Sequence, residues 1–93
     1  MDHVWVFTGP RSAFPSGVFT RRDLAEEWIQ KHGLSGTLTA YPLDVGVYEW
    51  ALNKGTFKPK RDDQQSAEFI QRFSSASQEH YHYENGSEGH SEG

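Results

Sequence analysis

The segment from Gly17 to Gly33, GVFTRRDLAEEWIQKHG, predicts one amphipathic helix with a marked start and a marked end. Thr20 stands where an N-cap hydroxyl is needed, and Asp23 follows three residues later in the manner of a capping box. Gly33 can adopt the left-handed conformation that closes a helix. We therefore expect a helix over residues 21–32.

This helix needs a partner, because about a dozen residues do not form a stable helix alone in water. Its apolar residues share one stripe at helical spacing, and charged residues cover the opposite side. The stripe consists of Leu24, Ala25, Trp28 and Ile29. We expect it to cover the face of a β-sheet, with the indole of Trp28 in the core.

Three extended segments are expected to form that sheet. Residues 3–8, HVWVFT, are rich in β-branched and aromatic residues and predict the central strand. Residues 14–19 predict an edge strand, because Pro15 cannot donate to a hydrogen-bonded ladder. Residues 34–41 alternate in polarity and predict a third strand. The chain direction makes the first strand antiparallel to the other two, so the expected order is second, first, third.

A second, shorter helix is predicted over residues 47–54. Asp44 is placed to cap it, and Gly55 is placed to end it. A strand over residues 43–48 is the alternative, because β-branched residues flank a glycine there.

The last part of the chain predicts a third helix and a further extended segment. Ser66 can cap the helix, and a single docking face follows at Phe69, Ile70 and Phe73. Residues 78–84, QEHYHYE, alternate histidine with tyrosine and could add a strand to the sheet edge.

These elements together predict an α+β fold. It is a two-layer sandwich in which a small, mainly antiparallel sheet carries helices on one face, in the order strand, strand, helix, strand, helix, helix, with an optional final strand. Residues 1–84 are expected to form this single domain. Residues 85–93, NGSEGHSEG, have the composition of a disordered acidic tail.

Charge and cysteine content narrow the classes of function. The net charge of −4 comes from the acidic C-terminal end, because the lysines and arginines of residues 1–72 are matched by as many acidic residues. A neutral body argues against nucleic-acid binding. The chain has no cysteine, no segment apolar enough to span a membrane and no signal peptide, so we expect a cytoplasmic protein.

A metal site is one chemical hypothesis for the C-terminal segment. His80, His82 and Glu84 would share one face of an extended strand, where two imidazoles and a carboxylate can approach one cation. The competing interpretation is that these residues are ordinary exposed side chains.

A binding surface is a second hypothesis, for the basic segment that follows the second predicted helix. Lys58, Lys60 and Arg61 could attract a phosphate or an acidic partner, although the adjacent aspartates would weaken their field. We group them with the aromatic residues of the C-terminal segment, Tyr81 and Tyr83, as a possible binding surface.

The sequence contains no catalytic motif that points to an enzyme. There is no GxSxG elbow and no phosphate-binding loop, so we assign no catalytic residue and expect no cofactor.

Several segments together resemble a small family of short bacterial domains of unknown function that occur as stand-alone proteins. They are VWVF, FPSGVF, AEEWI, LTAYPLDVGVYEWA and RFSSASQEHYHYE, and the resemblance covers residues 4–84. It implies a single small domain and no catalytic residue.

Two classes of function follow. The first is a non-enzymatic protein-interaction module that binds a protein partner or a second copy through the edge of the second strand or through the His/Tyr segment. The second is a small-molecule or metal-binding protein that uses the aromatic and histidine residues, namely Tyr48, Trp50, His80, Tyr81, His82 and Tyr83.

Overall fold

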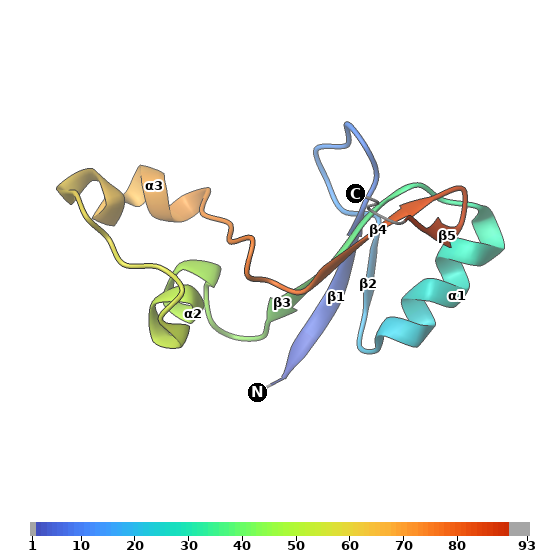
Figure 1. Ribbon diagram of the computed structural model, residues 1–93, viewed down its shortest axis with the longest axis horizontal. Helices are drawn as coiled ribbons and strands as arrows, with labels where there is room; N and C mark the ends of the chain where they lie inside the picture. Colours follow the sequence, from blue (N-terminus) through green and yellow to red (C-terminus); the bar gives the residue numbers. More distant parts are fainter. Residues whose placement is uncertain (1, 90–93) are drawn as a thin grey trace.

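The computed structural model describes residues 2–89, and its centre is a five-stranded antiparallel sheet (Figure 1). The strand order is β2-β1-β3-β4-β5. This confirms the α+β class and places the predicted order of second, first and third strand at one side of a wider sheet. The strands are β1 (His3–Thr8), β2 (Gly17–Phe19), β3 (Gly36–Pro42), β4 (His80–Glu84) and β5 (Ser87–Glu88).

The edge strand β2 is shorter than the predicted segment 14–19. Just before the strand begins, the Ser16 amide donates a hydrogen bond to the Phe7 carbonyl of β1, at 2.9 Å. Pro15 has no amide hydrogen to donate, which agrees with pairing that starts after it. Phe14 therefore lies in the loop between β1 and β2 rather than in the sheet.

Helix α1 (Arg22–His32) covers one face of the sheet, as predicted. Ala25 and Ile29 are fully buried in a cluster with the side chains that point toward the helix from β1, β3 and β4, which are Trp5, Phe7, Leu38 and Tyr83. Trp28 is only partly buried, and its ring contacts the Phe7 ring edge to face, with the ring centroids 5.6 Å apart. The indole therefore closes the border of the core, while the smaller Ile29 fills its centre.

The start of α1 differs from the prediction. The N-cap is Arg21 instead of Thr20, and no side chain caps the helix. Asp23 accepts hydrogen bonds from the Arg21 guanidinium, at 2.9 Å and 3.1 Å, which takes up the carboxylate that a capping box would use. The end agrees with the prediction, because Gly33 has φ 61° and closes the helix.

The other two helices form a separate arm beyond the end of the sheet (Figure 1). Helix α2 (Val47–Lys54), the 3₁₀ helix η1 (Asp62–Gln65) and helix α3 (Ala67–Gln71) surround a cluster of aromatic rings, Tyr48, Phe57, Phe69 and Phe73. The prediction that all helices lie on one sheet face was thus wrong for α2 and α3, because their rings bury each other. The molecule is elongated as a result, with extents of 45 × 28 × 25 Å.

The ends of the arm helices test the predicted caps. Helix α2 has the predicted bounds and ends at Gly55, which excludes the alternative strand over residues 43–48. Its N-cap is Gly46, so the cap predicted at Asp44 was wrong; Asp44 instead takes a turn conformation with φ 63°. The predicted cap of α3 is confirmed, because the Ser66 hydroxyl accepts a hydrogen bond from the Phe69 amide at 3.2 Å.

Strands β4 and β5 form a hairpin that extends into the predicted tail. Asn85 and Gly86 have φ values of 50° and 89° and join the strands in a two-residue turn. Asn-Gly is a strong signal for this kind of turn. The sequence analysis missed the turn because the composition of residues 85–93 favoured a disordered tail. Residues 85–89 thus belong to the sheet end, and the tail prediction for residues 90–93 lies outside the described residues.

Candidate interaction surface

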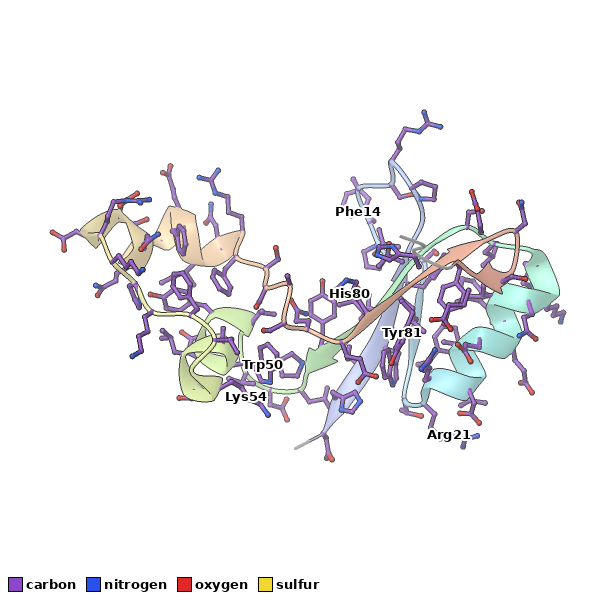
Figure 2. All side chains as sticks on the ribbon, viewed as in Figure 1. Phe14, Arg21, Trp50, Lys54, His80 and Tyr81 are labelled. Carbon is purple, nitrogen blue, oxygen red and sulfur yellow. The ribbon has the colours of Figure 1, made fainter. Side chains whose placement is uncertain are left out.

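The face of the sheet opposite α1 carries no buried residue within the described chain. Its side chains alternate with the core residues along each strand. Figure 2 shows this alternation on β4, where His80 and Tyr81 project to opposite sides of the strand. The residues of this open face are Val4, Val6, Thr8, Val18, Thr37, Thr39, Tyr41, His80, His82 and Glu84.

One row of the open face changes from apolar to polar across four strands. Val18 on β2 lies opposite Val6 on β1, Val6 lies opposite Thr39 on β3, and Thr39 lies opposite His80 on β4. The apolar end of the row is therefore at β2, which is one of the two edge strands of the sheet.

Exposed apolar side chains concentrate at this edge. Phe14 is 79% exposed and Val18 is 63% exposed, more than any other large apolar side chain of the described residues. Strand β2, Gly17–Phe19, has no charged residue. Natural edge strands are commonly protected by charges, so an apolar edge without them is a surface that can pair with another chain.

The His80, His82 and Glu84 side chains all lie on the open face and are exposed, as their alternation predicts. The two imidazole rings are neighbours, with centroids 5.4 Å apart. Glu84 does not complete a site with them, because no three histidine or acidic side chains among residues 2–89 lie close enough to hold one metal ion. Two of the three predicted ligands are thus brought together.

The basic segment belongs to the helical arm. Lys58, Lys60 and Arg61 are exposed between α2 and η1, far along the molecule from β4 (Figure 1). The Arg61 guanidinium pairs with Asp63 at 3.0 Å, and this partner lowers the pKa of the Asp63 carboxyl. The structure therefore separates these cations from the tyrosines with which the sequence analysis grouped them.

Tyr81 and Tyr83 point toward α1 and serve the core. The Arg22 guanidinium lies 3.4 Å from the centre of the Tyr81 ring. The buried Tyr83 donates its hydroxyl to Glu26 at 2.5 Å. Burial, followed by this hydrogen bond, raises the pKa of Tyr83 well above its usual value. Tyr83 is a structural residue, because strand alternation turns it to the covered face.

A groove that the sequence did not reveal lies where α2 meets the end of the sheet. Its volume is about 350 Å³, and its charged and aromatic lining includes Asp2, His3, Trp50, Lys54 and Glu79. Figure 2 shows Trp50 and Lys54 side by side on α2, with the lysine ammonium 6.0 Å from the indole centre. No local pattern could reveal this groove, because its residues come from the start of the chain, from β3, from α2 and from the segment before β4.

Of the aromatic and histidine residues grouped in the sequence analysis, only Trp50 lines this groove. Tyr48 lies in the aromatic cluster of the arm, and its hydroxyl donates to the Gln64 carbonyl at 2.9 Å. His80 lies on the open face. The structure thus divides the expected aromatic and histidine site among the groove, the arm and the two faces of β4.

Comparison with known families gives one match, over residues 4–89, to a family described as Domain of unknown function (DUF7710). The chain belongs to this family. The DUF7710 match runs from β1 through β5 and so includes the open face, the arm and the turn at Asn85. It confirms the expected membership of a family of unknown function, and it extends beyond the residue range 4–84 of the resemblance.

The search of curated proteins found no match, and neither did the search of solved structures. None of the helices described for this DUF7710 domain is long and apolar enough to cross a membrane.

Proposed function

We propose that this chain is a non-enzymatic protein-interaction module that associates through the free edge of β2. One observation carries the proposal: the most exposed large apolar side chains of the described residues, Phe14 and Val18, lie just before and within an uncharged edge strand. An edge strand can bind an extended segment through its backbone, while neighbouring side chains provide specificity.

The occupant that fits this edge is a second copy of the chain. Two β2 strands related by a two-fold axis would pair antiparallel and join two sheets into one. Their Val18 side chains would then lie on one continuous open face.

The lack of cysteine is compatible with a reducing compartment, and we propose that the association takes place in the cytoplasm.

The expected association is weak. Burying Phe14 and Val18 from each copy supplies on the order of 6–12 kcal/mol, against association costs of roughly 4–15 kcal/mol. The pairing is also short, because β2 has three residues. We therefore expect a dimer that depends on protein concentration in the micromolar to millimolar range.

Light scattering after size-exclusion chromatography, over a series of protein concentrations, tests the proposal. The wild type should shift from monomer toward dimer as concentration rises. Val18→Lys should stay monomeric, because it places a charge at the paired edge. Leu52→Lys is the matched control, because Leu52 is 37% exposed on α2 and should not affect association.

Two results would contradict the proposal. One is a wild type that remains monomeric up to millimolar concentration. The other is a Val18→Lys variant that dimerises like the wild type while its circular dichroism spectrum is unchanged.

A further inference from the structure

The orientation of the His80 ring is set by a backbone carbonyl. Its Nδ1 atom lies 2.8 Å from the carbonyl oxygen of Gln78. A carbonyl oxygen can only accept, so Nδ1 must carry the hydrogen and, in the neutral ring, Nε2 carries the lone pair. Histidines that bind metals typically have this arrangement, in which the second nitrogen donates to a carbonyl or a carboxylate.

The neighbouring His82 ring also has its polar contact at Nδ1. Its Nδ1 atom lies 3.4 Å from the hydroxyl oxygen of Thr37 on β3. Among residues 2–89, neither His80 nor His82 has a hydrogen bond to its Nε2 atom. Both side chains are exposed, so both Nε2 atoms can be reached from solvent.

The spacing of the two rings suits one shared ion. Two imidazoles bonded through Nε2 to a tetrahedral zinc ion, with Zn–N bonds of about 2.0 Å, have ring centroids about 5.2 Å apart. The centroids of His80 and His82 are 5.4 Å apart. The ring planes are nearly perpendicular, at 87°, so the two imidazoles are not stacked face to face.

We infer that His80 and His82 form a two-histidine site for a divalent transition metal ion on the open face of the sheet. The Nε2 atoms supply two ligands, and water or another molecule completes the coordination. Neutral imidazole suits Zn²⁺, Cu²⁺ and Ni²⁺ better than Mg²⁺ or Ca²⁺, which prefer oxygen ligands. Glu84 is not needed, because the pair chelates by itself.

This site is independent of the β2 edge. His80 and His82 lie on β4, two strands away from β1 and three from β2. A protein that fails to dimerise could still bind the ion, and a dimer could form without it. The two proposals can thus fail separately.

The test is a titration of the full chain with zinc chloride. Isothermal titration calorimetry measures the binding, and NMR of the imidazole nitrogens identifies the rings that respond. We expect saturable binding in which the Nε2 signals of His80 and His82 shift together. His80→Gln and His82→Gln should each weaken binding by at least about tenfold, and the double variant should show no site. A titration with magnesium chloride should leave both rings unchanged.

His32→Gln is the matched control, because His32 is an exposed histidine whose ring lies against Trp28 on α1, away from β4. It should bind zinc like the wild type. A stoichiometry of one ion per chain would support a site within one molecule, and half an ion per chain would support the same pair shared by two molecules. No response of either ring in the wild type, or undiminished zinc affinity in the double variant, would overturn the inference.

Discussion

Replacing Gly36 with alanine should destabilise the sheet at the start of β3. Gly36 has φ 152°, a conformation that residues with a side chain rarely adopt. An added Cβ would overlap the Thr8 carbonyl oxygen and would lie 2.7 Å from Cζ of the Phe7 ring. Neither neighbour can move easily, because Thr8 is held in β1 and Phe7 is buried in the core.

The magnitude follows from two separate costs. A backbone forced into a sparsely populated region costs about 1–3 kcal/mol, and overpacking next to a core ring costs about 1–3 kcal/mol more. A domain of this length has a total stability of roughly 5–14 kcal/mol. Gly36→Ala should therefore lower the free energy of unfolding by about 2–6 kcal/mol.

Gly33→Ala is the matched control. Gly33 also has positive φ, at 61°, but a Cβ there would meet nothing within 4 Å. It should cost only the conformational term, about 1–2 kcal/mol. Urea unfolding followed by circular dichroism gives both values. Equal destabilisation of the two variants, or a Gly36→Ala protein as stable as the wild type, would refute the argument that the contacts with Thr8 and Phe7 are tight.

Further changes test the core and the arm. Burial and the bond to Glu26 raise the pKa of Tyr83. The neutral Tyr83 hydroxyl therefore contributes its full stabilisation below pH ~10, and this contribution is lost as the pH rises above that value. Tyr83→Phe should reduce the alkaline loss of stability, measured by thermal unfolding from pH 8 to pH 11. Phe69→Ala should cost about 2–3 kcal/mol, less than a fully buried ring because Phe69 is partly exposed. Hydrogen exchange should then accelerate in α2 and α3 and remain slow in β1 and β3.

The proposed surfaces both lie on the side of the sheet that α1 does not cover. Antiparallel sheets can leave one face to solvent, and here the row from Val18 to His80 on the open face passes from apolar to polar. Association at β2 and metal binding at β4 would use the opposite ends of this row. The arm and its groove lie beyond the end of the sheet and take no part in either proposal.

Local patterns in the sequence were enough to predict most of the elements. The helical stripe that contains Ile29 predicted α1, the Ser66 cap predicted the start of α3, and the alternation of histidine with tyrosine predicted that the two residue types lie on opposite faces of β4. These features depend on neighbours a few residues away, so the sequence contains them directly. The turn at Asn85 was also present as a local signal, but the acidic, Gly/Ser-rich composition around it favoured a tail.

The tertiary structure alone decided where the elements meet. The rings of the arm pack on each other instead of on the sheet. Tyr81 and Tyr83 face α1, where they contact Arg22 and Glu26 respectively. The sequence could predict that a strand has two faces, but it could not show which face a helix would cover. That choice depends on contacts between residues far apart in the chain, and it determines why the open face carries the histidines and not the tyrosines.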